Sequence, residues 1–555
     1  MENGIKVGKR VRVPITSTRK TAGRAIQPFL SKQKQVDIVF FKKNRIFAFA
    51  TIRIEYIYYY PAINMKPEET ANQPEKENIT LTKSQDKALC RFKQFISDAN
   101  AQVYILKGYA GTGKTTLMRL FIKELSDQGL PYALLASTGR AAKILANITG
   151  EETCTVHSEI YRFTDLSQDL EQLAKRQEQE QPIADASGQL YLNFELLPRD
   201  NSNRLDVHNY YIVDEASMVA DAKDRTATQA IFGSGKLLYD LLRYDEQGKF
   251  IFVGDICQLP PVNQQISPAL DATYFLREYR IEAYECELTQ IMRQSGDNDI
   301  VLSAQKLRKL YHNPPMQQKW AKFPLRGYKN IHILNSQTEL VSRYVDSIRQ
   351  GGFNSSTMLC LENRQATQNT QLLRPIFGHH SPMLEKGDLL LITQNNLITG
   401  LMNGDLVVVE EVGAQTRRAG LTFVNVTVKE LFTGCTYSHL LISEVLYSNA
   451  TNISQTDHRA LYIDFYYRMK ENGVKQGSEE FKRSMMNDIY LNALRAVFGY
   501  VLTCHKSQGG EWDNVFIDIP RKFPILPKPY VYQWLYTAMT RARKELYVVN
   551  DFWVM

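Results

Sequence analysis

The most informative stretch of this 555-residue chain reads Gly108-Tyr109-Ala110-Gly111-Thr112-Gly113-Lys114-Thr115. An apolar run, Val103 to Leu106, precedes it, and a segment with a helical pattern, Leu117 to Leu125, follows it. Such glycines let backbone N–H groups curl around phosphate oxygens, while the lysine reaches the β- and γ-phosphates and the threonine hydroxyl coordinates Mg²⁺. The stretch therefore predicts a loop that binds ATP and Mg²⁺. Its expected contacts with the nucleotide are Gly108, Tyr109, Ala110, Gly111, Thr112, Gly113, Lys114, Thr115 and Thr116.

The segments on both sides of this loop alternate between helical and strand-like patterns. Helices are expected over Ala88 to Ile96 and Ala141 to Leu145, and buried strands over Tyr132 to Leu135, Tyr210 to Val213 and Phe250 to Val253. Strands that alternate with helices are typical of an α/β fold with a parallel sheet, which binds its ligands at the carboxyl ends of the strands.

Two polar segments that follow expected strands supply further groups for nucleotide hydrolysis. Asp214 comes directly after the run that ends at Val213 and is suited to hold the metal, and Glu215 is suited to polarise the attacking water. Gln258 lies in the loop 254–262, which two prolines stiffen, and its amide is suited to sense the γ-phosphate. No NKxD run that would select guanine follows, so ATP is favoured over GTP.

Taken in order, these motifs resemble those of the superfamily 1 helicases, in the branch that contains the RecD-like and Dda-like 5′-to-3′ DNA helicases. The resemblance covers residues 80–555. It implies two RecA-like P-loop NTPase lobes with parallel sheets, together with an inserted pin-type subdomain and a small SH3-like β-barrel. It also implies an ATP-dependent helicase that moves 5′-to-3′ along single-stranded DNA and unwinds duplex DNA as ATP closes the two lobes.

The same resemblance implies roles for individual residues. Gln85 matches the glutamine that recognises adenine, and Thr115 and Asp214 match the metal ligands. Arg293 and Arg541 match arginines that reach the γ-phosphate from the second lobe, so the implied catalytic residues are Lys114, Glu215, Gln258, Arg293 and Arg541. The implied DNA contacts are Ser137, Thr138, Arg140, Thr155, His157, Thr503, His505, Lys506 and Gln508.

Composition and motif order together predict three regions. Residues 1–78 form a basic extension and a linker, and residues 79–284 form the first lobe with an insertion at 160–208. Residues 285–555 form the second lobe, with an SH3-like and helical insertion at about 405–495. Residues 1–55 hold 13 lysines and arginines against three acidic residues, so their net charge is +10 and the rest of the chain carries −2 of the total of +8. Binding of single-stranded and tailed duplex DNA must therefore depend on local loop donors rather than on overall basicity.

Composition also excludes several classes of protein. Hydrophobic residues make up 44% and charged residues 23%, as in soluble globular proteins, and no apolar run is long enough to cross a membrane. Seven scattered cysteines without a CxxC pair argue against a zinc ribbon and favour reduced thiols. We therefore expect a cytoplasmic monomer, associated with the nucleoid in a bacterium. The basic, serine- and threonine-containing start also has the composition of an organelle transit peptide.

Two other functions remain open at this point. One is an RNA helicase of the same superfamily, although the chain has no Cys/His-rich zinc module. The other is a regulatory ATPase that clamps nucleic acid without unwinding it. DNA repair and recombination are the expected settings, but the sequence does not select a pathway.

Overall fold

The computed structural model describes residues 81–178, 189–197, 209–223, 229–291, 298–448 and 450–555. These residues belong to one compact unit, which spans Ile63–Met555. The predicted extension at 1–78, part of the insertion at 160–208 and the predicted finger Arg293 lie outside the described residues.

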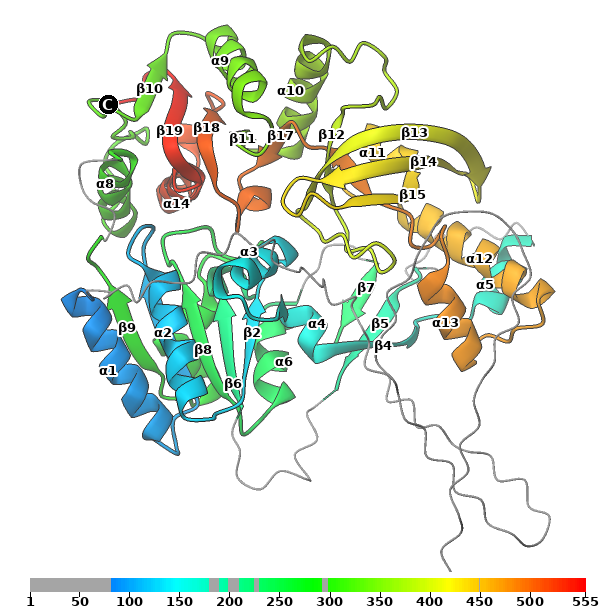
Figure 1. The fold of residues 1–555 in the computed structure, drawn as a ribbon, viewed down its shortest axis with the longest axis horizontal. Helices are drawn as coiled ribbons and strands as arrows, with labels where there is room; N and C mark the ends of the chain where they lie inside the picture. The colour runs from blue at the N-terminus through cyan, green and yellow to red at the C-terminus, as the bar shows by residue number, and fades with distance from the viewer. Residues whose placement is uncertain (1–80, 179–188, 198–208, 224–228, 292–297, 449) are drawn as a thin grey trace, which may run out of the picture. The chain divides into compact units, whose positions relative to one another are not determined.

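The first lobe is built on a six-stranded parallel sheet in the order β3-β2-β6-β8-β1-β9. Its strands are β1 (Val103–Gly108), β2 (Tyr132–Ala136), β3 (Thr153–Thr155), β6 (Tyr210–Asp214), β8 (Lys249–Gly254) and β9 (Tyr284–Leu288). Apolar residues of α1 (Lys83–Ser97) and α2 (Lys114–Asp127) pack on one face (Figure 1), and those of α4 (Val156–Ile160) and α6 (Leu237–Tyr244) pack on the other. The predicted α/β fold with a parallel sheet is confirmed.

The predicted boundary between the lobes, at residues 284 and 285, needs correction. Strand β9 begins at Tyr284 and pairs in parallel with β1, from Tyr104 opposite Tyr284 to Gly108 opposite Leu288. The first sheet therefore extends through Leu288. The sequence did not show this because β9 alternates charged and apolar residues, and only its pairing with the buried β1 makes it an edge strand of the first sheet.

A small three-stranded sheet occupies the region of the first predicted insertion. It joins β4 (Tyr161–Leu166) antiparallel to β5 (Leu192–Leu196), and β5 parallel to β7 (Ala230–Phe232). Helix α5 (Leu170–Glu178) follows β4 and packs through Leu170 and Leu173 against α12 (Gln455–Glu471). The third strand, β7, comes from beyond the predicted insertion.

The second lobe has its own parallel sheet, in the order β10-β19-β18-β11-β17. Its strands are β10 (Ile331–Leu334), β11 (Ser356–Cys360), β17 (Val501–Thr503), β18 (Trp512–Asp518) and β19 (Ala542–Val549). The helices of this lobe are α8 (Ile300–His312), α9 (Gln337–Gly351), α10 (Asn363–Ile376) and α14 (Lys528–Met539). Their buried apolar residues share one core with the sheet.

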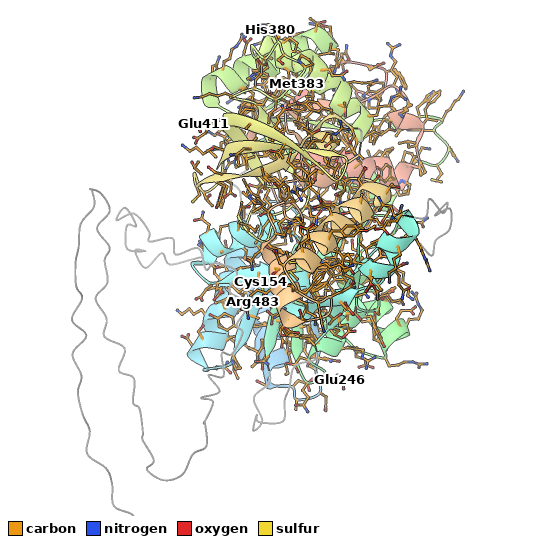
Figure 2. All side chains as sticks on the ribbon, turned by 90° about the vertical axis from the view of Figure 1, so that its right-hand side faces the viewer. Cys154, Glu246, His380, Met383, Glu411 and Arg483 are labelled. Atoms are coloured by element: carbon orange, nitrogen blue, oxygen red, sulfur yellow. The ribbon has the colours of Figure 1, made fainter. Side chains whose placement is uncertain are left out.

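The second insertion is a five-stranded antiparallel sheet in the order β15-β14-β13-β12-β16. The strands are β12 (Leu389–Ile392), β13 (Leu406–Arg418), β14 (Leu421–Glu430), β15 (Thr436–Ile442) and β16 (Ala496–Phe498). The helices α11 (Ser443–Tyr447), α12 and α13 (Glu479–Asn487) lie between β15 and β16. Figure 2 shows Met383, in the loop that leads from α10 to β12, and Glu411, on β13. The predicted bounds of 405–495 are too narrow, because β12 and β16 pair with each other and β12 pairs with β13.

In the part of the chain that the structure describes, no helix is both long enough and apolar enough to cross a membrane.

Candidate nucleotide and nucleic-acid site

The predicted phosphate loop lies between the end of β1, at Gly108, and the start of α2, at Lys114. Gly111 and Gly113 have φ values of 77° and 79°, a left-handed conformation that glycine adopts without strain. A Cβ atom on Gly108 would lie 2.7 Å from Cγ of Lys114, so the loop has no room for a side chain there. The backbone is thus curled at the N-terminus of α2, where the orphan N–H groups and the helix dipole favour an anion.

The backbone of the phosphate loop holds the Lys114 side chain in place. Its Nζ donates to the carbonyl oxygens of Gly108 at 2.8 Å and Tyr109 at 3.4 Å. Burial raises the pKa values of both Asp214 and Asp255, and the charge of the ammonium opposes each rise, which places the three charges in one neighbourhood at the carboxyl ends of β1, β6 and β8.

Asp214 is the acid of this group that ends β6. Burial, assisted by the charge of Glu215, raises the pKa of Asp214 to about 6, and the charge of Lys114 opposes that rise. Glu215 donates its backbone N–H to Oδ1 of Asp214 at 2.8 Å and adopts a φ of 49°, a strained value for a side chain of this size. The Asp214 carboxylate and the Thr115 hydroxyl both offer hard oxygen ligands, so the chemistry of these residues fits Mg²⁺ bound together with a nucleotide phosphate.

Gln85 supports the phosphate loop from α1. Its side chain closes a capping box, in which Oε1 accepts from the Thr82 N–H at 3.0 Å, and Nε2 donates to the Thr112 carbonyl at 3.1 Å. Gln85 is 1% exposed. The role predicted for it at adenine stays a prediction, because both polar atoms of its amide bond to protein here.

Gln258 follows β8 in a loop that meets the second lobe. The Leu259 N–H donates to Oγ1 of Thr537 on α14 at 2.9 Å, and Gln508 Nε2 donates to the Leu259 carbonyl at 3.2 Å. The Gln258 side chain is buried, and its Oε1 has no hydrogen-bond partner among the described residues. The loop thus links the nucleotide site to two segments of the second lobe.

The first-lobe residues predicted to contact DNA lie at helix starts. Thr138 and Thr155 are the N-caps of α3 (Gly139–Thr149) and α4, and each hydroxyl accepts a backbone N–H of its own helix. The Ser137 hydroxyl is buried without a partner in the described part of the chain. His157 packs against the rings of Tyr161 and Phe232, and burial lowers its pKa to about 4, so His157 is neutral at neutral pH.

Arg140 lies at the boundary between the lobes rather than on an open face. Its guanidinium carbon is 4.5 Å from the centroid of the Trp512 ring of the second lobe, and burial lowers its pKa to about 10. The Nη1 atom of Arg140 has no partner among the described residues. A buried cation with an unused donor is suited to an anionic ligand such as a DNA phosphate.

The second-lobe residues predicted to contact DNA form the end of β17 and the turn after it. Thr503 and Gln508 are buried, and burial lowers the pKa of the Lys506 ammonium to about 8 and also lowers that of His505. A Cβ atom on Gly509, next in the chain, would lie 3.2 Å from Cβ of Ala141 in α3. The structure therefore brings this turn against the first-lobe segment 137–142.

Arg541 stands at the end of α14 and is 4% exposed. It donates from Nε to the Thr537 carbonyl at 3.1 Å and from Nη1 to the Gly510 carbonyl at 3.3 Å. These acceptors are neutral, so these hydrogen bonds do not pair the Arg541 guanidinium with a carboxylate. Its role as an arginine finger stays a prediction.

A buried ion-pair cluster also joins the lobes, and the sequence did not reveal it. Nζ of Lys143 on α3 lies 2.5 Å from Oδ2 of Asp405 and 2.8 Å from Oε1 of Glu430, on the antiparallel sheet. All three side chains are nearly inaccessible to solvent. Lys143 would have looked like a solvated helix lysine, and the charged neighbours that could have identified it lie more than 260 positions away.

Comparisons with known proteins match this arrangement. The family model described as AAA domain matches residues 80–313, and the one described as UvrD-like helicase C-terminal domain matches residues 498–549. The ATP-dependent RecD2 DNA helicase of Deinococcus radiodurans is 25% identical over 452 residues, which cover 81% of this chain and 47% of that protein. The ATP-dependent DNA helicase dda of Enterobacteria phage T4 is 40% identical over 79 residues, which cover 14% of this chain and 18% of that protein.

A crystal structure of Pif1 helicase from Bacteroides, in complex with ADP-AlF3 and ssDNA, aligns with a TM-score of 0.43 at 17% identity. That alignment covers 86% of this chain and 93% of the other. The chain spans less than half the length of the curated relatives it matches. The two family matches fall on the two parallel-sheet lobes and contain the motifs in the order set out above, so the chain is similar to the superfamily 1 helicases and, within them, to RecD-like members.

Proposed function

We propose that this chain is an ATP-driven DNA helicase that moves 5′-to-3′ along single-stranded DNA and unwinds tailed duplexes. The observation that best supports this is the meeting of the two segments expected to hold DNA. A Cβ atom on Gly510 would lie 2.8 Å from Cζ of Arg140, so the turn after β17 and the start of α3 are in contact across the lobes. The same two lobes meet at the phosphate loop, so nucleotide and DNA would bind along one junction.

The proposed chemistry uses residues that end or follow strands of the first sheet, together with two arginines assigned to the second lobe. Mg²⁺·ATP, when bound, supplies a γ-phosphoryl group whose charge the metal partly neutralises. Lys114 would hold the phosphates, and Thr115 and Asp214 would hold the metal. Glu215 would orient and deprotonate a water molecule, and Gln258 and Arg541, with Arg293 outside the described residues, would stabilise the charge that develops on the phosphoryl oxygens.

The proposed motion is the closing and opening of the lobes. The loop 254–262 bonds to both Thr537 and Gln508, so a shift of that loop is passed to the segment before Arg541 and to the turn expected to hold DNA. We assign the antiparallel pair of β4 and β5 as the pin-type subdomain and the sheet of β12 to β16 as the SH3-like barrel. We also propose that the protein acts as a monomer in the cytoplasm, on single-stranded and tailed duplex DNA.

An unwinding assay with 5′-tailed, 3′-tailed and RNA-tailed duplexes tests this function. Lys114→Ala should abolish ATP hydrolysis and unwinding, and Glu215→Gln should retain ATP binding but lose turnover. We expect strand separation only with the 5′ DNA tail. Preference for an RNA tail would favour the RNA helicase, and DNA-stimulated hydrolysis without strand separation on any substrate would favour the clamping ATPase. Normal hydrolysis in either variant would contradict the site assignment.

A further inference from the structure

One hydroxyl of the second lobe reaches into the phosphate loop. The Ala110 N–H donates to Oη of Tyr536 at 3.1 Å, and Tyr536 Oη donates to Oδ2 of Asp255 at 2.6 Å. Tyr536 lies on α14, whereas Ala110 and Asp255 follow β1 and β8 of the first lobe. A single oxygen atom therefore connects two functional loops of one lobe to a helix of the other.

The direction of these bonds is fixed by the chemistry of the groups. Asp255 is fully buried, and its other oxygen accepts the Cys257 N–H at 2.9 Å. Burial raises the pKa of Asp255, and the charge of Lys114 opposes that rise. The pKa of Tyr536 is raised well above its ordinary value by burial and by Asp255, so the hydroxyl keeps its proton and gives it to the carboxylate. The lone pairs of the hydroxyl are then free to accept the Ala110 N–H. Removing the hydroxyl would leave the buried Asp255 carboxylate without this donor, which would cost free energy.

The helix that carries Tyr536 is attached to the same loop at two further points. Thr537 accepts the Leu259 N–H at 2.9 Å, and Gln533 Nε2 donates to the Gln258 carbonyl at 3.3 Å. Tyr109, Ala110, Arg308 and Tyr536 line one pocket beside the phosphate loop. Among these contacts, only Tyr536 touches both the phosphate loop and the loop 254–262.

We propose that Tyr536 is a positioning residue through which α14 responds to a nucleoside triphosphate in the phosphate loop. Its hydroxyl sets the position of the Ala110 N–H relative to Asp255, so a displacement of either loop moves α14. Arg541 lies just beyond the C-terminus of the same helix and contacts the Gly510 carbonyl, beside the segment expected to bind DNA. Tyr536 thereby links nucleotide state to DNA affinity; this rests on the proposed nucleotide and DNA binding.

The test compares Tyr536→Phe, which removes only the hydroxyl, with Tyr532→Phe on the same helix. Tyr532 is fully buried and packs edge-on against Phe323 at 6.0 Å, away from the phosphate loop. The measurement is the affinity of a fluorescein-labelled oligothymidylate with saturating ADP and with a β,γ-imido analogue of ATP. The affinity of the protein for each nucleotide is measured in parallel, and thermal unfolding verifies that the variants fold.

The wild-type protein and Tyr532→Phe should bind the oligonucleotide with different affinities in the two nucleotides. Tyr536→Phe should bring the ratio of these two oligonucleotide affinities about tenfold closer to one, as expected for a hydrogen bond to a charged group. It should change the affinity for ADP much less. Asp255→Asn, which weakens the same acceptor, should act in the same direction and is informative if Tyr536→Phe does not fold.

Two results would overturn the proposal. In one, folded Tyr536→Phe has the same ratio of oligonucleotide affinities, with the analogue and with ADP, as the wild-type protein. In the other, the variant binds both nucleotides equally more weakly and that ratio does not change. Failure of the proposed function would look different. In that case the wild-type protein itself would bind no nucleotide, or would bind the oligonucleotide equally with ADP and with the analogue.

Discussion

At the scale of single residues, the candidate site depends on how burial changes the chemistry of Asp214. The ordinary pKa of an aspartate is 3.8, and the folded protein raises it to about 6 through burial and the nearby charge of Glu215. Because the folded pKa is the higher one, protonated Asp214 favours the folded state. That contribution is complete below pH 4 and is lost as the pH rises through about 6. At neutral pH the ionised carboxylate is costly, and a metal cation beside it would offset that cost.

The first prediction is that Mg²⁺-dependent nucleotide binding weakens as the pH falls through about 6, because Asp214 binds the metal only when ionised. A higher Mg²⁺ concentration should move the midpoint to lower pH, since metal and proton compete for the same oxygens. Titrations of a fluorescent ADP at fixed Mg²⁺ concentrations measure both effects. Glu215→Gln should lower the midpoint by removing a negative neighbour, and Asp214→Asn should remove the pH step. A profile that is flat between pH 5 and pH 8 in the wild-type protein, whose Asp214 has a pKa of about 6, would contradict this account.

The second prediction concerns Arg541, whose hydrogen-bond acceptors among the described residues are all neutral. Arg541→Ala should reduce DNA-stimulated ATP turnover by about 10³-fold or more, the usual effect of removing an arginine finger, while nucleotide affinity falls far less. Arg543→Ala is the matched control, because that arginine is half exposed and pairs with Asp513 at 3.1 Å. Steady-state hydrolysis with saturating single-stranded DNA gives the comparison. Equal rates in the two variants would show that Arg541 has only a structural role at the C-terminus of α14.

At the scale of elements, the buried ion pair between α3 and the antiparallel sheet gives a test of how the lobes are joined. The Lys143 side chain is 8% exposed, and its partners Asp405 and Glu430 are 2% and 1% exposed. Removing one member of a buried pair leaves the others without compensation, which costs about 3–5 kcal/mol. An exposed pair such as Lys482 and Glu479, whose carboxylate side chain is 86% exposed, contributes less than about 1 kcal/mol.

The third prediction is therefore that Lys143→Met lowers the denaturant midpoint strongly and Lys482→Met leaves it almost unchanged. The loss should be smaller at pH 5 than at pH 8, because burial raises the pKa of Asp405, so that this carboxyl can take up a proton when Lys143 is absent. Denaturant unfolding followed by circular dichroism at both pH values measures the difference. Equal midpoints for the two variants at pH 8 would contradict a stabilising role for this cluster.

Elements also show how far the sequence could predict the fold. The apolar runs before Gly108, Asp214 and Asp255 are strands because they are buried on both faces of a parallel sheet, and their composition alone indicates this. Strands β9, β12 and β16 were missed because each is short and is defined by its partner. The contacts of Tyr536 and Lys143 were missed for the same reason. A tyrosine in an apolar helix and a lysine on an amphipathic one acquire their roles from residues that are distant in sequence.

At the scale of the whole molecule, charge is distributed unequally along the chain. Residues 1–55 carry a net charge of +10, and the remainder, which contains both lobes, carries −2. In the proposed function, the groups between the lobes would therefore have to supply specific DNA binding through local geometry, and Arg140 and Lys506 are the candidates for it. The basic extension can add only the salt-sensitive attraction that any cluster of lysines and arginines has for phosphates.

The last prediction follows from this division. A protein that begins at Met65 keeps every motif from Gln85 onward, so it should fold and retain DNA-stimulated ATP hydrolysis and its preference for a 5′ tail. Its affinity for single-stranded DNA should fall less steeply with salt, because fewer counterions are released when fewer cations meet the phosphates. Fluorescence anisotropy across a salt series, run beside the full chain, measures both slopes. An equal slope would show that residues 1–64 do not contact DNA. Loss of solubility or of ATP hydrolysis would instead show that the segment 36–63 contributes to the first lobe.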